Sequence, residues 1–495
     1  MNYVIRTTGV SMPPKQIQIH TECKQELADM ITPVGIYLRL RDHFPYSILL
    51  ESMDNQPNQK SFSYICCDPI ASFRVENEAL FQQFLEGPEQ ATPINERAQV
   101  CTALRAFLET FSVKQDNVPI HLYNGLFGYM AYDSIRYFED ITLQAEKTPA
   151  QAIPDLQYHA YRYILAIDHH KNQLFLQKNH IVHAPQDKVT QNPDTTLSLE
   201  AISALVHAQD TPTFPFELRG ETTSNFEDHE YLTVVEQCKQ HIQRGDVFQI
   251  VPSRRFCQAF RGDEFNLYRA LRAINPSPYL FYFDCGNFKI FGSSPEAQLV
   301  VQGSHARLFP IAGTYKRTGN EEVDQKAIRR LHEDPKENAE HVMLVDLARN
   351  DLSRHCTEVL VESYKQIQRY SHVIHLTSEV VGTLEPDAHP IDLLASTFPM
   401  GTLSGAPKHR AMQIIDRLER GRRHTYGGAI GLLGFDHSCH HAIVIRSFLS
   451  KDNQLFFQAG GGIVSASKPE DELQEINNKL GALNAALQMA TQITR

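Results

Sequence analysis

Two helix-like segments of the chain carry carboxylates that could bind a hard divalent cation. Glu340 lies in the segment 334–351, and Glu472 and Glu475 lie three residues apart near the C-terminus, on one face of a helix. Oxygen ligands from two helices, with positions left open for a substrate carboxylate, suit magnesium better than zinc. Any one of these carboxylates could equally belong to a solvated acidic face paired with lysines of its own helix.

Glycines form a second set of candidate site residues in the C-terminal half. The clusters are GSSPE (292–296), PIAGT (310–314), GTLSGAPK (401–408), YGGAIG (426–431) and AGGGIV (459–464). Any single cluster is more often a tight turn than a binding site. Together they predict backbone amides that can approach an anion closely, because glycine has no Cβ.

The helices that must position the carboxylates are the clearest elements in the sequence. Pro335 suits the first turn of a helix over 334–351. Ser467 and Glu470 have the spacing of a capping box at the start of the C-terminal helix. Apolar residues then repeat every three or four positions, at Leu473, Ile476, Leu480, Leu483 and Leu487. This pattern predicts an amphipathic helix.

The N-terminal part of the chain has a different pattern. Residues 1 to about 180 alternate short apolar runs with Pro, Asn and Gly, which is typical of strands and turns. The polar stretch 183–196, a short helix-like segment and the Pro-rich 209–217 indicate a linker. We therefore predict an N-terminal regulatory or structural domain over 1–215 and a catalytic domain over 216–495.

The composition is that of an ordinary globular protein. The 495 residues are 42% hydrophobic and 21% charged, and the net charge of -11 argues against nucleic acid or a membrane surface as a partner. No run of about 18 apolar residues occurs and no signal peptide is evident, so we expect a cytoplasmic protein. The nine cysteines contain no C-x-x-C pair, which predicts reduced thiols.

Long motifs in a fixed order resemble those of a known family. The chain is similar to the chorismate-utilising enzymes, and most of all to the large subunits of anthranilate synthases, densely from about 225 to 485. The remaining matching motifs are LLES (49–52), GLFGYMAYD (125–133), GDVFQIVPSRRF (245–256), NPSPY (275–279), AEHVMLVDLARNDL (339–352) and YSHVIHLTSEV (370–380). The resemblance implies an α+β fold of large antiparallel sheets packed orthogonally and flanked by helices.

The resemblance implies a Mg²⁺ ion held by Glu340 and Glu475 against the ring carboxylate of chorismate. The ion would neutralise this carboxylate and draw electrons from the ring. Glu296 matches the general acid that protonates the departing ring hydroxyl, and its pKa would have to be raised by desolvation. Lys479 matches a positive charge near the metal-bound carboxylate.

The second carboxylate of chorismate has its own matching residues. By the resemblance it is met by Tyr426, Arg446 and the amides of Gly460, Gly461 and Gly462. An arginine beside a nest of glycine amides is a sound anion clamp. Gly461 stands where alanine is usual in the family.

Four further residues match positions around the substrate. Gly313 and Thr314 would line the pocket, Thr402 would contact the substrate, and His375 would assist the elimination of pyruvate. Structural functions stay open for His375, Thr402 and Lys479. The family frequently has an Arg-Pro pair where this chain has YKRTG from Tyr315, and Phe309 is a further departure.

Two positions separate the relatives by reaction. Isochorismate and salicylate synthases carry a lysine that deprotonates water where this chain has Gln249, which cannot act as that base. Aminodeoxychorismate synthases often carry a nucleophilic lysine where this chain has Ala312. No G-x-C-x-G elbow surrounds any cysteine, so ammonia must come from elsewhere. The resemblance implies that its source is a separate glutamine amidotransferase subunit, and therefore a hetero-oligomer.

LLES and NPSPY resemble a site for inhibition by L-tryptophan, with Ser52, Pro278, Tyr279 and Leu280 at the matching positions. Methionine is common where Leu280 stands, and the same residues could simply be core and turn residues. The chain contains no tryptophan beside 27 Phe and 19 Tyr, which would help an enzyme that must be made when tryptophan is scarce.

The sequence therefore predicts a lyase of tryptophan biosynthesis. It would aminate chorismate to 2-amino-2-deoxyisochorismate and then eliminate pyruvate to give anthranilate. Two alternatives stay open: an aminodeoxychorismate synthase subunit of folate synthesis, and a catalytically silent tryptophan-sensing subunit. Retention of Glu296, Glu340, His375, Arg446 and Glu475 argues against the silent subunit.

Overall fold

A computed structural model describes most of the chain. The described residues are 17–52, 61–84, 87–115, 119, 122–145, 149–182, 196–369 and 373–493. Their helices are α1 (Pro33–Leu40), α2 (Gln99–Glu109), α3 (Leu199–Val206), α4 (Asp228–Gln243), α5 (Phe265–Ile274), α6 (Glu321–Glu333), α7 (Pro335–Leu352), α8 (Pro390–Thr397), α9 (Gly401–Ser404), α10 (Lys408–Leu418) and α11 (Pro469–Ala490). Two 3₁₀ turns are η1 (Tyr132–Tyr137) and η2 (Pro149–Gln151).

The strands come from both halves of the sequence. In the N-terminal half they are β1 (Ile17–Leu27), β2 (Ile48–Glu51), β3 (Phe62–Glu76), β4 (Ala79–Phe84), β5 (Gln90–Pro93), β6 (Phe111–Gln115), β7 (Gly125–Met130), β8 (Leu156–Asp168) and β9 (Gln173–Val182). The next eight strands in the chain are β10 (Phe216–Ser224), β11 (Gln249–Ile250), β12 (Ser253–Gly262), β13 (Tyr279–Asp284), β14 (Phe288–Ser294), β15 (Ala297–Gln302), β16 (His305–Leu308) and β17 (Ile311–Lys316). The last are β18 (Cys356–Arg369), β19 (Val373–Leu384), β20 (Gly405–Ala406), β21 (Ala429–Gly434), β22 (Cys439–Ile443), β23 (Ser447–Lys451) and β24 (Gln454–Gly460).

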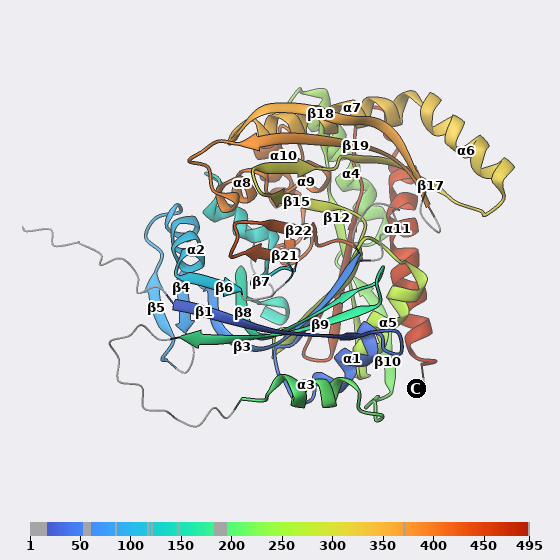
Figure 1. Cartoon of the computed structure of the whole chain (residues 1–495). Coiled ribbons are helices and arrows are strands. Elements are labelled where there is room, and N and C mark those ends of the chain that lie inside the picture. The colour runs from blue at the N-terminus through green and yellow to red at the C-terminus, as the bar shows by residue number, and fades with distance from the viewer. Residues whose placement is uncertain are drawn as a thin grey trace, which may run out of the picture.

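One large curled sheet organises the molecule. Apart from the small pair β11–β20, the strands of the described residues are hydrogen-bonded into one continuous sheet, in which only β1 and β6 run parallel. Antiparallel pairing of β2 with β13 and of β7 with β21 joins the two halves of the chain. Helices flank the sheet, with α11 along one side and α6 extending away from the body (Figure 1). The predicted α+β fold is confirmed.

The two largest of the four hydrophobic clusters among the described residues lie against this sheet. The first contains α1, α4, α5 and α11, and the second contains α2, α8 and the buried strand β7. Both cores include residues from each half, so the halves share the sheet and its cores. The division into domains near residue 215 stays a prediction, although β10 begins at Phe216.

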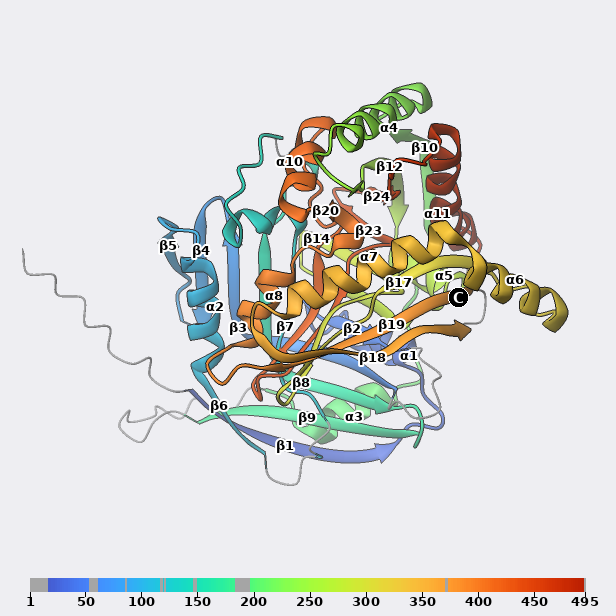
Figure 2. The same cartoon turned by 90° about the horizontal axis from the view of Figure 1, so that it is seen from above.

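The two helices that carry the candidate carboxylates are present. α7 lies across β17, β18 and β19 (Figure 2). In α11 the side chains of Ile476, Leu480, Leu483 and Leu487 are buried, as the periodicity predicts. Burying each stabilises the fold by about 2 kcal/mol, which fixes the rotation of α11 and therefore the direction of its polar residues.

The capping box at the start of α11 was a wrong prediction. The helix begins at Pro469, so Lys468 occupies the N-cap position and its side chain makes no capping bond. Ser467 Oγ instead accepts the amide N–H of Val464 at 3.1 Å. Proline favours the first helical position, which moves the start of the helix one residue past the expected one.

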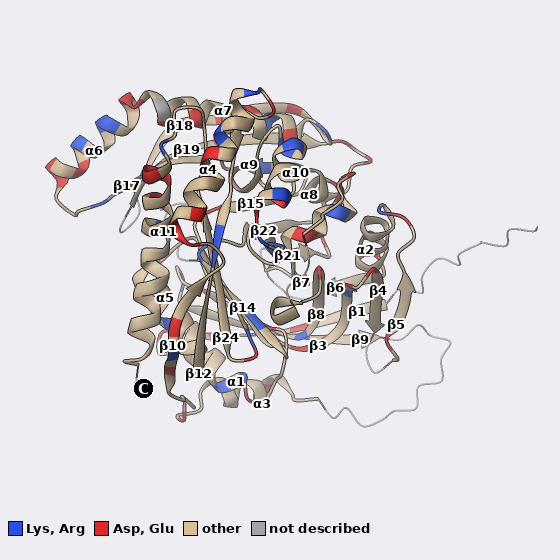
Figure 3. Cartoon of the chain, turned by 180° about the vertical axis from the view of Figure 1, so that it is seen from behind, with Lys and Arg blue, Asp and Glu red and all other residues tan. Residues whose placement is uncertain are grey.

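The surface and the thiols fit the composition. Acidic and basic residues are interspersed over the face shown in Figure 3, most visibly on α6. All nine cysteines are free, as expected for reduced thiols. In the described part of the chain, no helix combines the length and the apolar character needed to span a membrane.

Candidate active site

Glu296 is a buried carboxyl between β14 and β15. Its side chain accepts a hydrogen bond from Thr402 Oγ1 at 3.0 Å, and the residue is 7% exposed. Burial raises the pKa of Glu296 to about 7, although the Thr402 bond and the charges of Arg446 and Lys479 act in the opposite direction. Glu296 is therefore half protonated near neutral pH, as a general acid requires.

Arg446 offers a cation to the same pocket. It lies between β22 and β23 with a left-handed backbone (φ 49°), and its carbonyl oxygen accepts the amide of Ser293 at 3.1 Å. Burial lowers the pKa of its guanidinium, and Glu296 raises it. The guanidinium makes no hydrogen bond or salt bridge with any other described residue. It is therefore available to a bound anion.

His375 lies on β19, opposite Thr314 of β17. The ring is 2% exposed, and Nδ1 lies 3.1 Å from the carbonyl oxygen of Gly313. A carbonyl can only accept, so Nδ1 carries the proton and Nε2 has the lone pair. Burial lowers the pKa of His375 to about 4, assisted by Arg446 and opposed by the Gly313 bond. The neutral ring can act as a base. The side chain of Thr314 lies outside the described residues.

Gly313 shapes the strand beside His375. Its backbone is left-handed (φ 65°) at an irregularity in the β17–β19 register. A Cβ at this position would lie 2.4 Å from Leu331 Cδ1 and 3.0 Å from Glu337 Oε2. Only glycine fits both the conformation and the space.

Carboxylates from α7 and α11 both face the loop after β24. A Cβ built on Gly462 would lie 3.6 Å from Glu340 Oε1, and one on Gly461 would lie 4.0 Å from Glu475 Oε1. The same Cβ on Gly461 would be 3.4 Å from Glu472 Oε2. Because consecutive Cα atoms are about 3.8 Å apart, the carboxylates of both helices face one short stretch of backbone.

Gln249 connects this loop to α7. Its Nε2 donates to Glu340 Oε1 at 3.1 Å and would lie 2.5 Å from a Cβ on Gly462. Its Oε1 is buried without a hydrogen-bond partner among the described residues. A buried amide oxygen in this state suits a small donor such as ammonia or a water.

Lys479 and Glu475 form an ion pair at the edge of the site. Their 2.7 Å contact joins positions four apart on α11, and each side chain is 42% exposed. Lys479 Nζ also donates to the carbonyl oxygen of Gly460 at 2.8 Å. Exposed pairs of this kind contribute at most about 1 kcal/mol, so a cation can compete for Glu475.

The glycine amides are only partly available to an anion. The hydroxyl of Tyr426 accepts a backbone hydrogen bond from Gly460, and a Cβ on Gly460 would lie 2.9 Å from that hydroxyl. The amide of Gly461 donates to the carbonyl oxygen of Pro252 at 3.3 Å. The nest expected from Gly460 to Gly462 is therefore not fully open in this conformation, because strand pairing already uses part of it.

The oxygen donors fit a magnesium ion that keeps other ligands. No three Asp, Glu, His or Cys side chains of the described residues gather closely enough to hold a metal alone. Glu340 and Glu475 would supply two hard oxygens, and Mg²⁺ commonly takes one or two carboxylates and completes its shell with water and substrate. The glycines leave room for such a shell, since a Cβ there would approach the carboxylates.

The residues that resemble a tryptophan site also come together. Leu280 of β13 pairs with Glu51 of β2 at the end of their ladder, and Ser52 directly follows Glu51 in the chain. Pro278 is buried just before this strand. In the next ladder Tyr279 pairs with Ser294 of β14, two residues before the general-acid candidate. Whether this place binds tryptophan stays a prediction.

Sequence reasoning missed two charged residues behind the site, Glu419 and Arg423. Their spacing of four residues, directly after the end of α10, was a visible signal of an ion pair, but the same spacing is common in solvated helix pairs. The structure buries both side chains and joins them at 2.5 Å.

Comparison with known proteins places this geometry in a family. The family model of chorismate-binding enzymes matches residues 46–485. Anthranilate synthase component 1 of Geobacillus stearothermophilus is 37% identical over 94% of this chain and 93% of its own length. Anthranilate synthase component 1 of Thermus thermophilus is also 37% identical, over 94% of this chain and 97% of its own length.

Solved structures agree with these sequence relatives. Anthranilate synthase component I of Streptococcus pneumoniae superposes with a TM-score of 0.70 and 30% identity, over 93% of this chain and 99% of that one. The menaquinone-specific isochorismate synthase of Escherichia coli, at 20% identity and a TM-score of 0.71 over 97% of each chain, shares the fold. The chain belongs to the anthranilate synthase component 1 family of chorismate-binding enzymes.

Proposed function

We propose that this chain is the aminating subunit of an anthranilate synthase that serves tryptophan biosynthesis. It aminates chorismate with ammonia to 2-amino-2-deoxyisochorismate and then eliminates pyruvate to form anthranilate. The observation that best supports this proposal is the buried carboxyl of Glu296, whose pKa is raised to about 7, between the hydroxyl of Thr402 and the guanidinium of Arg446. A proton donor beside an available cation suits an anionic substrate that must lose a hydroxyl group.

The two carboxylates of chorismate have separate binding places in this proposal. Arg446 meets the carboxylate of the enolpyruvyl side chain, and Tyr426, whose hydroxyl lies near Gly460, is assigned to the same carboxylate by the family resemblance. Glu340 and Glu475 would hold Mg²⁺, which would bind the ring carboxylate. The ion, when bound, neutralises that carboxylate and withdraws electrons from the ring. Lys479, which pairs with Glu475, adds positive charge at the same end.

Two protein groups move protons. Glu296 protonates the ring hydroxyl, which leaves as water while ammonia forms the new bond to a ring carbon. The new ammonium group then loses one proton, which balances the proton that Glu296 gave up. Gln249 Oε1, buried beside Glu340, can accept a hydrogen bond from that ammonia. In the second step the neutral His375 takes the ring proton as the enolpyruvyl C–O bond breaks, and the side chain leaves as pyruvate after gaining a proton on its methylene carbon.

The pH dependence of kcat/KM should reflect these two groups. Glu296 must be protonated and His375 neutral, so activity is expected between about pH 4 and about pH 7. Above the pKa of Glu296, kcat/KM for chorismate should fall by about tenfold per pH unit. The measurement holds the concentration of free NH₃ constant, because the ammonium equilibrium would otherwise mask the fall. An alkaline limb that persists in Glu296→Gln would contradict this assignment.

The rival reactions need residues that this chain lacks. Gln249 cannot deprotonate water as the lysine of isochorismate and salicylate synthases does. Ala312 is buried on β17 and has no nucleophile for a covalent intermediate. The ammonia comes, in this proposal, from a separate glutamine amidotransferase component.

Product identification tests the proposal. The purified chain is mixed with chorismate, Mg²⁺ and ammonium, and anthranilate fluorescence and pyruvate are recorded together. Both products are expected. An aminated product without pyruvate would indicate the aminodeoxychorismate synthase reaction, and folded protein that forms neither would favour the silent sensing subunit.

Tryptophan inhibition tests the β2–β13 junction. If Ser52 binds the inhibitor, Ser52→Ala should raise the tryptophan concentration for half inhibition by about fivefold, the equivalent of one net hydrogen bond. Because Ser52 lies outside the proposed active site, kcat and KM should stay unchanged. Ser363→Ala on β18 serves as the matched control. Equal inhibition of both variants and the unaltered protein would exclude Ser52.

A further inference from the structure

Behind Tyr426 lies an ion pair that is fully enclosed. The side chains of Arg423 and Glu419 are 2% and 5% exposed. Arg423 Nη2 lies 2.5 Å from Glu419 Oε1, and its Nε lies 2.9 Å from Oε2. Glu419 Oε1 also accepts the amide and the hydroxyl of Ser253, at 2.8 and 2.7 Å. This two-point contact holds the guanidinium plane in one orientation.

The remaining donors of Arg423 reach two segments that line the site. Nη1 donates to the carbonyl oxygen of Leu403 at 2.6 Å, and Nη2 donates to that of Val251 at 2.6 Å. Leu403 directly follows Thr402, whose hydroxyl binds Glu296. Val251 lies two residues after Gln249, which binds Glu340. One guanidinium thus fixes the backbone next to two residues of the proposed site.

The guanidinium of Arg423 also lies close to two tyrosine rings, one of which belongs to the proposed site residue Tyr426. Its carbon lies 4.8 Å from the ring centre of Tyr132 and 5.6 Å from that of Tyr426. A cavity of about 20 Å³, lined partly by Arg423 and Tyr426, lies on this side. Such a volume holds about one water molecule. Without Arg423 the ring of Tyr426 would have space to move away from Gly460.

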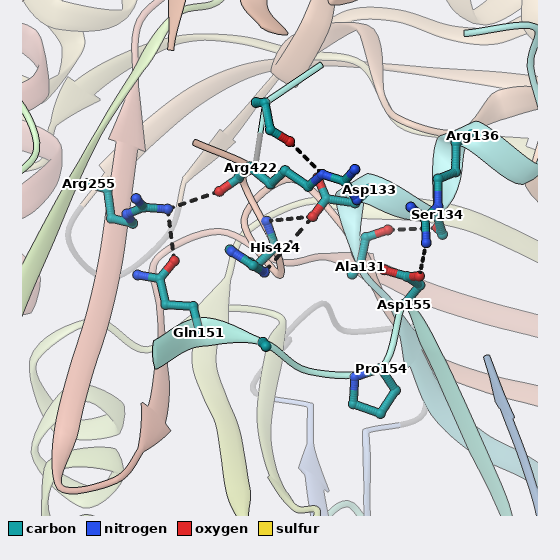
Figure 4. A network of polar contacts seen from close by, with 12 residues as sticks. Ala131, Asp133, Ser134, Arg136, Gln151, Pro154, Asp155, Arg255, Arg422 and His424 are labelled. Atoms are coloured by element: carbon teal, nitrogen blue, oxygen red, sulfur yellow. Dashed lines mark hydrogen bonds and ion pairs between the residues drawn. The ribbon is translucent and has the colours of Figure 1, made fainter. Parts of the chain in front are cut away.

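The residues on either side of Arg423 are anchored as well. The carbonyl oxygen of Arg422 accepts Arg255 Nη1 at 2.9 Å, and the amide of His424 donates to Asp133 at 3.3 Å (Figure 4). Arg255 also binds Gln151 Oε1 at 2.8 Å. The chain around Arg423 is therefore anchored to β12 through Arg255 and to the N-terminal half through Asp133, and Arg255 is itself bound to Gln151.

We propose that Arg423, oriented by Glu419, is a positioning residue that holds the segments bearing Thr402, Gln249 and Tyr426 around the substrate. This inference rests on the proposed function, and it assigns no contact between Arg423 and the substrate. A lysine keeps the charge but has a compact ammonium group in place of the planar fork. It cannot bind Glu419, Leu403 and Val251 in the same geometry.

Arg423→Lys separates positioning from simple stability. Misplacement of site residues by about 1 Å can cost about 10²-fold in rate, so kcat should fall by that order while KM for chorismate changes less. The bond from Thr402 lowers the pKa of Glu296, and the other charges that act on Glu296 are Arg446 and Lys479. Loosening Thr402 should therefore move the alkaline limb of kcat/KM to higher pH.

Lys408→Met provides the matched control. Lys408 and Asp351 form a comparably buried pair at the other end of α10, with side chains 9% and 4% exposed and a 2.9 Å contact. Loss of the Lys408–Asp351 pair should lower the Tm of the protein without moving the pH profile of kcat/KM. Glu419→Gln, which keeps an acceptor for Ser253, offers a milder second variant and should shift the profile in the same direction as Arg423→Lys.

A spectroscopic readout separates this inference from the proposed reaction. The infrared C=O band of protonated Glu296, identified by its absence in Glu296→Gln, is titrated in the unaltered protein, Arg423→Lys, Glu419→Gln and Lys408→Met. A higher midpoint in the first two variants alone would support the positioning of Thr402, whether or not anthranilate forms. The same Glu296 midpoint in the unaltered protein and all three variants, or an equal shift of the midpoint in Lys408→Met, would overturn the proposal that Arg423 positions Thr402.

Discussion

Glu296→Gln is expected to lower kcat by about 10²- to 10⁴-fold, the usual contribution of a general acid. The amide keeps the shape of the side chain and can still accept the bond from Thr402, but it has no proton to give to the leaving hydroxyl. KM for chorismate should change little, because Arg446 and the carboxylates of α7 and α11 stay in place. Steady-state kinetics of anthranilate formation measures both quantities.

Relative to the unaltered protein, the stability of the same variant should increase as the pH rises. The pKa of Glu296 is raised from 4.5 to about 7 in the folded protein. A carboxyl with a raised folded pKa destabilises the fold once it ionises, so stability is lost as pH rises from the unfolded pKa through the folded one. Relative to the unaltered protein, Glu296→Gln should gain up to about 3 kcal/mol between pH 4.5 and 8.

Thermal unfolding over this pH range checks the gain in stability. Glu322→Gln, in the exposed first turn of α6, is the matched control and should show no such pH-dependent gain. Loss of activity without the gain in stability would mean that Glu296 is not the ionising group in the pocket. A gain in stability without a loss of activity would show that Glu296 is not the general acid of the reaction.

Glu340→Gln and Glu475→Gln are each expected to weaken Mg²⁺ and chorismate binding together. Removing a group that merely orients a metal ligand costs about 10- to 100-fold in affinity, so loss of a ligand should raise the half-saturating Mg²⁺ concentration by at least about 10²-fold. Chorismate affinity should fall as well, because its ring carboxylate depends on the same positive charge.

Calorimetric titration of Mg²⁺ with and without chorismate measures this coupling. Glu470→Gln lies in the first turn of the same helix and is the matched control, expected to bind as the unaltered protein does. Unchanged magnesium dependence in Glu475→Gln would reassign the ligand, and Glu472 would be the next residue to substitute because it faces the same glycine.

Local sequence patterns predicted some elements well. The apolar periodicity predicted α11, and Pro335 predicted the start of α7, because each of these signals lies within a few residues of the chain. The motifs also identified Glu296, and its environment supplies the raised pKa that such a residue needs. The roles of Glu296 and of the other matched residues stay predictions.

Contacts between distant segments could not be predicted in this way. The pairing of β2 with β13 joins residues more than 200 positions apart, and neither strand encodes its partner. The enclosure of Arg423 depends on Leu403 and Val251, which come from separate segments. The amide of Gly461 is occupied by Pro252 for the same reason, since strand pairing decides which donors are used.

The ladder from β2 through β13 to β14 places Tyr279 opposite Ser294, next to the proton donor of the proposed reaction. An effector that displaces Tyr279 would therefore alter the catalytic carboxyl through a single pair of strands, without rotation of one domain against another. Thermodynamic reciprocity then requires bound substrate to weaken that effector by the same factor by which the effector weakens the substrate. The substrate and the effector would then compete with each other although they bind at separate places, because both places share this ladder of strands.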